Sequence, residues 1–175
     1  MAIYVFDNAP LSCFARAMRL PELDRLTAGN ERVTTRAVID EIRNGVAAFP
    51  ELQEVLDLAW LRVEAVDGLD ELRLFAKYAR RLGSDVHDIG EASVLAWAEA
   101  NGAIAFTDDE AAVQAGRDEG VEVRRTLAVV ARGIKHGVLS DVEADRLVDD
   151  LLRAGGRFPF SAGEFVRWAR ENGLV

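Results

Sequence analysis

The sequence is poor in the residues that form disulfides and zinc sites. Its 175 residues include one cysteine, Cys13, and two histidines, His87 and His136, which stand far apart. A single thiol cannot close an internal disulfide, so we expect a reducing compartment. Two isolated histidines lack the spacing of zinc ligands, so a zinc site is not indicated. Stability must come from hydrophobic burial, which a chain of this length can supply.

Long hydrophobic segments are also missing. No apolar run in the sequence approaches the length needed to span a bilayer. The first residues, Met1 to Asp7, carry no basic segment, and their apolar run is too short for a signal peptide. We therefore expect a cytoplasmic protein that does not interact with a membrane.

Positive charge is scarce. Lysine and arginine number 21 against 30 aspartates and glutamates, so the formal net charge is −9. This balance argues against a strong non-specific nucleic-acid binder, which usually presents a basic face. It does not exclude a nuclease, because several acids can lie in one site where a metal ion neutralises them. Most of the acidic surplus is expected on solvated helix faces.

Short apolar segments alternate with amphipathic ones along the chain. The short segments predict strands, and the amphipathic segments, with caps such as Thr35 and Ser140 before them, predict helices. This alternation is typical of an α/β fold with a parallel sheet covered on both faces. We expect a catalytic domain over residues 1–139, with residues 140–175 as a helical extension packed on it. The predicted strands are 3–6, 32–34, 61–66, 103–107 and 121–123. The predicted helices include 11–18 and 69–82, and Ser161 is expected to cap the last helix.

Acidic residues follow the predicted strands. In open α/β sheets, ligands gather at the carboxyl ends of the strands. Asp7 comes directly after the first strand, and Asp108 and Asp109 come directly after the fourth. Glu41 lies on the helix after the second strand, and Glu91 is expected at the start of a helix after the loop 83–90. We therefore expect these carboxylates to converge at one edge of the sheet.

Converging carboxylates repel each other unless a cation lies between them. Mg²⁺ and Mn²⁺ prefer oxygen ligands, and such ions can activate a water for phosphodiester hydrolysis. Each acid alone also fits a structural role as a turn residue, helix cap or first-turn acid. The whole set favours a metal site formed by Asp7, Glu41, Glu91 and Asp109, with Asp108 or Asp88 in support. One or two ions remain possible, and Asp109 is favoured over Asp108 as the fourth ligand.

Other polar residues near these acids are candidates for binding RNA. Asn8 follows the first acid and Thr107 precedes the acidic pair, although the sequence favours a turn role for Asn8 and, slightly, a plain strand end for Thr107. Basic residues could guide RNA phosphates toward the acids, or could simply be solvated. These basic residues are Arg16, Arg19, Arg36, Arg124 and Arg125.

Four acidic motifs occur in a fixed order. They are Val5-Phe6-Asp7-Asn8-Ala9-Pro10-Leu11, Val38-Ile39-Asp40-Glu41-Ile42, Asp88-Ile89-Gly90-Glu91-Ala92 and Phe106-Thr107-Asp108-Asp109-Glu110-Ala111-Ala112. With Gly120 to Leu127, this set resembles the PIN-domain family, the fold of the VapC-type toxins, and within it the Gly-Glu-Ala, Asp-Asp subgroup. The resemblance covers roughly Ile3 to Gly156.

The resemblance carries specific expectations. It implies a three-layer α/β/α sandwich, a Mg²⁺- or Mn²⁺-dependent endoribonuclease, and the role of toxin in a type II toxin–antitoxin pair. A small antitoxin partner and a homodimer are also implied. The subgroup often has an arginine shortly after the Asp-Asp pair, where this chain has Val113-Gln114, so Arg117 is the expected substitute for substrate binding. The subgroup also tends to have Gly-Thr where this chain has Arg125-Thr126.

Two other classes of protein compete with this interpretation. One is a PIN-like interaction module that binds metal and a partner protein without cleaving RNA. The other is a receiver-type signalling domain, which also binds Mg²⁺ at strand ends. A receiver needs an acidic pair after the first strand and a lysine after the fifth. This chain has only Asp7 in the first place and no lysine near Val123, so the receiver is disfavoured.

Overall fold

Parallel strands form the centre of the fold. The computed structural model describes residues 1–83 and 86–175, and side chains except those of residues 84–87. Within these ranges, five strands pair in the order β3-β2-β1-β4-β5, and every pairing is parallel. This confirms the predicted α/β class. The strands are β1 (Ile3–Phe6), β2 (Glu31–Thr35), β3 (Arg62–Glu64), β4 (Ile104–Phe106) and β5 (Val123–Arg124).

Strand β1 lies in the middle of the sheet and of the core. Val5 is in register with Val33 of β2 on one side and with Ala105 of β4 on the other. All three side chains are fully buried. The ring of Phe6 stacks on Phe106 of the neighbouring strand, with 5.0 Å between centroids. A strand buried on both faces has a short, almost entirely apolar sequence, which is why β1 and β4 were predictable.

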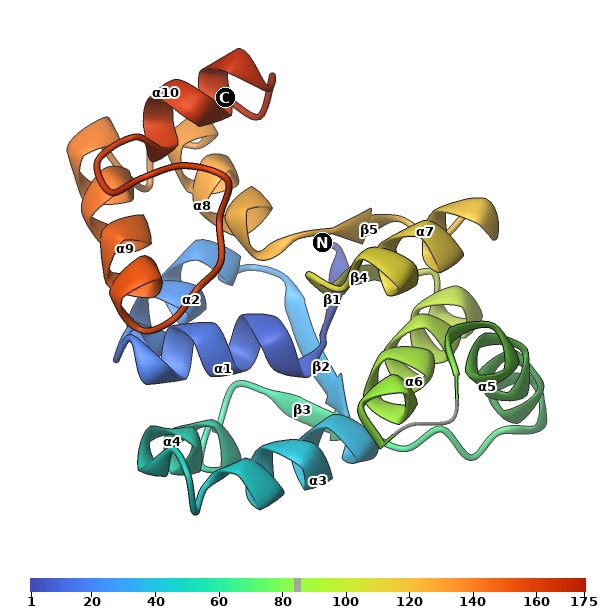
Figure 1. Cartoon of the computed structure of the whole chain (residues 1–175). Coiled ribbons are helices and arrows are strands. Elements are labelled where there is room, and N and C mark those ends of the chain that lie inside the picture. The colour runs from blue at the N-terminus through green and yellow to red at the C-terminus, as the bar shows by residue number, and fades with distance from the viewer. Residues whose placement is uncertain (84–85) are drawn as a thin grey trace.

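Helices cover both faces of the sheet. Figure 1 shows α5, α6 and α7 on one side, α1, α2, α8 and α9 on the other, and α3 with α4 below the edge strand β3. The helices on the first side are α5 (Leu69–Leu82), α6 (Val86–Asn101) and α7 (Glu110–Asp118). The others are α1 (Asn8–Arg16), α2 (Leu20–Thr27), α3 (Arg36–Gly45), α4 (Gln53–Leu56), which follows the 3₁₀ turn η1 (Pro50–Leu52), α8 (Thr126–Lys135), α9 (Asp141–Arg153) and α10 (Phe165–Glu171).

Two predicted helix starts are confirmed by their caps. The Thr35 hydroxyl accepts a hydrogen bond from the backbone N–H of Val38 (3.3 Å) at the start of α3. Ser140 and Glu143 form a reciprocal capping box at the start of α9. Each cap satisfies backbone N–H groups that have no partner within the helix. The predicted cap at Ser161 is wrong, because α10 begins only at Phe165.

Two helices begin earlier than predicted. Helix α1 starts at Asn8, directly after Asp7, whereas the sequence favoured a start at Leu11. Pro10 is tolerated there because the first amides of a helix have no internal partner. Helix α6 starts at Val86, so the second half of the expected loop 83–90 is helical. Ser84 and Asp85 of that predicted loop lie outside the described residues, as does the side chain of His87.

The C-terminal helices share the core of the sheet domain. Leu147 and Leu151 of α9 and Phe165 of α10 are buried in the same cluster as β1. Helix α9 packs on α8 and α1, and α10 packs on α9. The division of the chain at residue 139 stays a prediction. None of the helices in the described ranges has the length and hydropathy needed to cross a membrane.

Candidate functional site

Asp7 is held at the junction of β1 and α1. It is the N-cap of α1, and its Oδ1 accepts a hydrogen bond from the backbone N–H of Asn8 (2.7 Å). Its Oδ2 accepts from the Thr107 hydroxyl (2.7 Å), which comes from the end of β4. Only 3% of Asp7 is exposed. The carboxylate is therefore fixed in place by contacts from two neighbouring strands.

Thr107 connects Asp7 to the acid on the next strand. It is fully buried, and its hydroxyl oxygen also accepts a hydrogen bond from the backbone N–H of Asp109 (3.3 Å). Because the hydroxyl is shared between two acids and is out of solvent, Thr107 is placed to position Asp7 rather than to contact RNA. Asp109 caps α7 through Oδ1, which accepts from the N–H of Ala112 (2.8 Å).

Glu41 reaches the same region from α3. Its Oε2 accepts a hydrogen bond from the side-chain amide of Asn8 (3.2 Å). The amide oxygen of Asn8 in turn accepts from the Ser12 hydroxyl (2.5 Å), one turn further along α1. Asn8 therefore orients Glu41 through its donor group, while Ser12 fixes the orientation of Asn8.

Gly90 allows Glu41 to approach α6 closely. A Cβ on Gly90 would lie 2.3 Å from Oε1 of Glu41, which is far inside van der Waals contact. The adjacent turn of α6 is fixed by the Ser93 hydroxyl, which donates to the Gly90 carbonyl (2.6 Å) and lies 2.7 Å from the Thr35 hydroxyl. The glycine that resembled a helix breaker is thus a point of contact between α3 and α6.

The pKa values of two acids are raised by burial and by the negative charges of nearby carboxylates. Burial raises the pKa of Asp7 to about 6, and the charges of Asp108 and Asp109 add to this increase, although hydrogen bonds from Thr107 and Asn8 oppose it. Burial also raises the pKa of Glu91 to about 8. The further causes for Glu91 are the negative charges of Asp7, Asp109, Asp88 and Glu41. The acids predicted from the sequence therefore act on each other electrostatically.

Asp108 and Asp109 have different local partners. Both oxygens of Asp108 bind Thr126 at the start of α8, with 2.8 Å to its backbone N–H and 2.6 Å to its hydroxyl. Asp108 thus ties β4 to α8. The charge of Asp109 raises the pKa of Glu91, and the charges of Asp108 and Asp109 both raise the pKa of Asp7. The preference for Asp109 as the fourth ligand stays a prediction.

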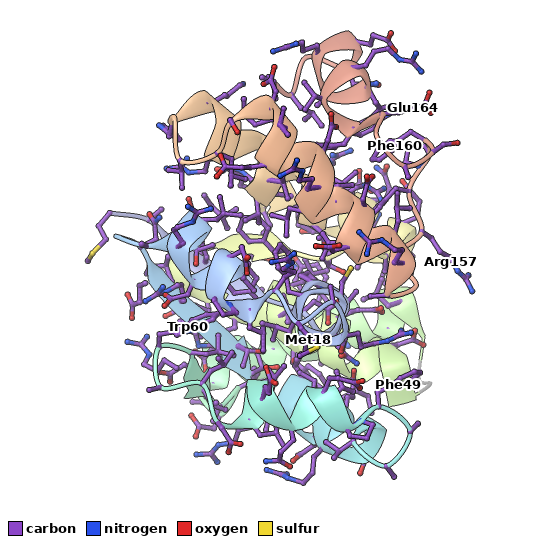
Figure 2. All side chains as sticks on the ribbon, turned by 90° about the vertical axis from the view of Figure 1, so that its left-hand side faces the viewer. Met18, Phe49, Trp60, Arg157, Phe160 and Glu164 are labelled. Atoms are coloured by element: carbon purple, nitrogen blue, oxygen red, sulfur yellow. The ribbon has the colours of Figure 1, made fainter. Side chains whose placement is uncertain are left out.

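A pocket of about 530 Å³ lies among these acids. Asp7, Glu41 and Glu91 line it, together with Asn8. Arg16 of α1 also lines it and lies over the ring of Phe49, 4.1 Å from the centroid. Figure 2 shows Phe49 at the surface of the molecule, beside the end of α3. The pocket thus combines carboxylates with a cation that could bind a phosphate.

Three lining residues were missed by the sequence analysis. Asn44 and Ser12 each lie one helical turn from a predicted site residue, Asn44 after Glu41 and Ser12 after Asn8. This spacing is a signal that could have identified them. Phe49 is 41% exposed and lies in the irregular segment after α3, where no periodic pattern could place it.

Arg117 is not brought to the pocket that Asp7, Glu41 and Glu91 line. It lies at the end of α7 and lines a separate pocket beside β5. Helix α7 starts at the carboxyl edge of the sheet and runs away from it, so a residue near its C-terminal end lies at the opposite edge. The expectation that Arg117 replaces an arginine in the acidic site therefore finds no support in the geometry.

The donor set fits a hard divalent cation in its chemistry. It consists of carboxylates on four different elements, and burial and mutual repulsion disfavour their charged forms unless a cation compensates them. Among the described residues, no group of three or more His, Cys, Asp or Glu side chains is already arranged to hold a metal ion. Binding an ion would therefore require these side chains to move toward one another.

Comparison with known proteins was made for the whole chain. A family model described as a PIN domain matches residues 3–164. This match spans the sheet, all of the acids described above and helix α9. The chain has no significant match among curated proteins or among solved structures.

Proposed function

The chain belongs to the PIN-domain family, whose members are typically nucleases, and we propose that it is a Mg²⁺- or Mn²⁺-dependent endoribonuclease. The observation that carries this proposal is that Asp7, Glu41 and Glu91 line one pocket, and that the charges of Asp7, Glu41 and the nearby Asp109 all raise the pKa of Glu91. We infer that Asp7, Glu41, Glu91 and Asp109 hold the metal. A bound ion of this kind lowers the pKa of a water and stabilises charge on a phosphodiester.

The chain's own residues prepare this chemistry. Thr107 fixes the orientation of Asp7, and Asn8 fixes that of Glu41, so each carboxylate is held in a defined orientation beside the pocket. Arg16 supplies positive charge at the pocket wall and can bind a phosphate of the RNA. No side chain is assigned as a nucleophile, because in-line attack by a water would leave a 5′-phosphate and a 3′-hydroxyl, and a bound divalent ion would activate that water.

The first test is cleavage of a panel of labelled single-stranded RNAs in Mn²⁺ or in chelator. Wild-type protein should cut in Mn²⁺ only, and Asp7→Asn should lose at least about a hundredfold in rate, because it removes a proposed ligand. Asp40→Asn is the matched control. Asp40 neighbours Glu41 in sequence, but it is exposed and pairs with Arg43 (2.6 Å). The control should cleave like the wild type.

Other outcomes separate this proposal from its alternative. Cleavage that survives in chelator, or in Asp7→Asn, would contradict the metal mechanism. Metal binding by a folded protein that cuts none of the RNAs would favour the PIN-like interaction module.

We also propose that the protein is the toxin of a type II toxin–antitoxin pair, with a small antitoxin as its partner and a homodimer as its assembly. The resemblance to VapC-type toxins supports this role. Leu69, which is 78% exposed, and Leu72 offer apolar surface on α5 for association.

Expression should arrest bacterial growth, and Asp7→Asn should abolish the arrest. A wild type that leaves growth unaffected while cleaving RNA in solution would exclude the toxin role. A monomer in sedimentation analysis would exclude the dimer.

A further inference from the structure

A second groove runs beside the open edge of the sheet. Strand β5 is the last strand in the sheet order, and the segment before α10 lies across from it. Between them is a pocket of about 490 Å³. The lining residues that matter here are four arginines and two aromatic residues, Arg117, Arg124, Arg125, Arg157, Phe158 and Trp168.

The arginines make this groove basic in a protein of net charge −9. Arg124 pairs with Glu122, and Arg125 pairs with Glu110. Arg117 and Arg157, by contrast, form no ion pair within the described part of the chain and are both exposed. Figure 2 shows Arg157 extending away from the ribbon into solvent. These two cations can therefore bind a ligand without breaking an existing ion pair.

The aromatic side chains form a braced wall. Phe160 connects the two lining rings, with 5.9 Å between its centroid and that of Phe158 and 5.0 Å to that of Trp168. Phe158 and Trp168 are both partly exposed. Such rings can stack on bases without choosing among them, because every base has a π-face.

The groove is connected to the acidic site through Asp108. This residue lines the groove, and its neighbour Asp109 acts on Glu91 in the acidic pocket. Arg125 donates a hydrogen bond to the backbone carbonyl of Asp108 (2.9 Å), which fixes one arginine at the junction. A strand lying in the groove would therefore lead toward the acids.

We propose that the groove along β5 binds single-stranded RNA, with Arg117 and Arg157 on its phosphates and Phe158 and Trp168 against its bases. A positively charged channel combined with aromatic platforms is the arrangement that holds single strands without sequence preference. This inference rests on the proposed function and adds a binding site outside the acidic pocket. The acidity of the remaining surface would restrict RNA to this path.

Binding is measured in chelator, so that no cleavage is needed. The probe is a labelled single-stranded oligoribonucleotide of mixed sequence, followed by fluorescence anisotropy at several salt concentrations. In Arg117→Ala with Arg157→Ala, we expect about tenfold weaker binding. The slope of log Kd against log salt should fall by about 1.4, because each contact to a single strand contributes about 0.7.

The chain offers a matched control for lost charge. Arg25 and Arg146 are exposed, form no ion pair among the described residues, and line a different pocket beside α2 and α9. Arg25→Ala with Arg146→Ala removes the same charge from the molecule and should bind RNA like the wild type. Equal weakening in both double variants would overturn the proposal, because it would show only general electrostatic attraction.

Trp168 gives an independent signal from inside the groove. RNA should quench part of the tryptophan fluorescence of the wild type, and Trp168→Phe should lose that quenching while keeping an aromatic ring. Trp97 is only 4% exposed, and Trp60 lies against Arg32 (4.8 Å from the ring centroid) outside the lining of the groove, so neither should report RNA. Quenching that persists in Trp168→Phe would contradict contact at this wall.

The remaining outcomes are equally decisive. A polyglutamate of equal charge that binds more tightly than the RNA, and loses affinity in Arg117→Ala with Arg157→Ala, would assign the groove to an acidic protein and overturn the proposal. Because binding is measured without metal, a failure here leaves metal-dependent cleavage untouched. A protein that binds RNA in the groove but never cleaves it would overturn only the proposed function.

Discussion

At the scale of single residues, the hydrogen-bond partners of each acid determine how its carboxylate is held in the site. The sequence was sufficient to select Asp7, Glu41, Glu91 and Asp109 as candidate ligands, because each follows a predicted strand or lies in an acidic motif. It could not separate Asp108 from Asp109 by partner. That distinction depends on Thr126, which is remote in sequence and donates two hydrogen bonds to Asp108.

Thr107→Val should test the residue that joins two acids. Valine has the shape of threonine, but it cannot donate to Asp7 or accept from the N–H of Asp109. We expect the cleavage rate to fall about 10- to 100-fold, as is usual when the partner of a metal ligand is removed. The hydrogen bond from Thr107 lowers the pKa of Asp7, so its loss should raise that pKa further.

The measurement is the rate of RNA cleavage as a function of pH. The acidic limb of the profile should move to higher pH in Thr107→Val, and Thr107→Ser should restore the wild-type profile. A rate loss without any movement of this limb would mean that Thr107 acts only through packing.

At the scale of elements, the glycines at helix ends explain which helices were predictable. Helix α5 was predicted with both ends correct, because Gly68 precedes it and Gly83 follows it, as glycines at helix ends commonly do. Helix α6 was predicted to begin too late, since Gly90 resembled a loop residue. The reason for this glycine lies in another element, because it makes room for Glu41 of α3.

Gly90→Ala should separate the intrinsic helix propensity of alanine from the steric effect of its Cβ on Glu41 of α3. In an isolated helix, alanine is favoured over glycine by about 1 kcal/mol. Here its Cβ would meet the Glu41 carboxylate at 2.3 Å, so Glu41 must move and metal-dependent cleavage should fall at least about tenfold. The protein should gain little or no stability from the change.

A double variant shows whether the effect passes through Glu41. In a Glu41→Ala background the obstructing carboxylate is gone, so adding Gly90→Ala should raise the free energy of unfolding by about 1 kcal/mol. Urea denaturation of the four proteins measures this difference. The same stability change in both backgrounds would mean that Gly90 and Glu41 do not interact.

At the scale of the whole molecule, crowded acids make stability depend on pH and metal together. The pKa of Asp7 is raised to about 6 from an ordinary 3.8, and that of Glu91 to about 8 from 4.5. An acid whose pKa is raised on folding favours the folded state most below its ordinary pKa. That contribution is lost as the pH rises through about 6 for Asp7 and about 8 for Glu91, and for Asp7 it amounts to up to about 3 kcal/mol.

Thermal unfolding at low and high pH should therefore respond differently to Mn²⁺. In chelator, Tm should fall between pH 5 and pH 8, and Mn²⁺ should raise it much more at the higher pH, where the carboxylates are ionised. Asp7→Asn should be more stable than the wild type in chelator at pH 8. Equal stabilisation by Mn²⁺ at both pH values would argue against binding at these acids.

Charge distribution was the feature least accessible from the sequence. The net charge predicted that RNA would meet no broad basic face, and an even solvated surface was as plausible for the arginines as a basic rim. The fold instead gathers Arg117, Arg124 and Arg125 with Arg157 of the C-terminal segment. Only the packing of residues 140–175 against β5 and α8 could bring these positions together.

The hydrogen bond between Thr107 and Asp7 joins positions that are 100 residues apart. During translation, β1 leaves the ribosome early, but the strand that orients its acid is made only after more than half of the chain. The nascent polypeptide therefore passes through most of its synthesis without an assembled site. Under the proposed function, the protein would not attack the messenger that encodes it until its own translation is well advanced.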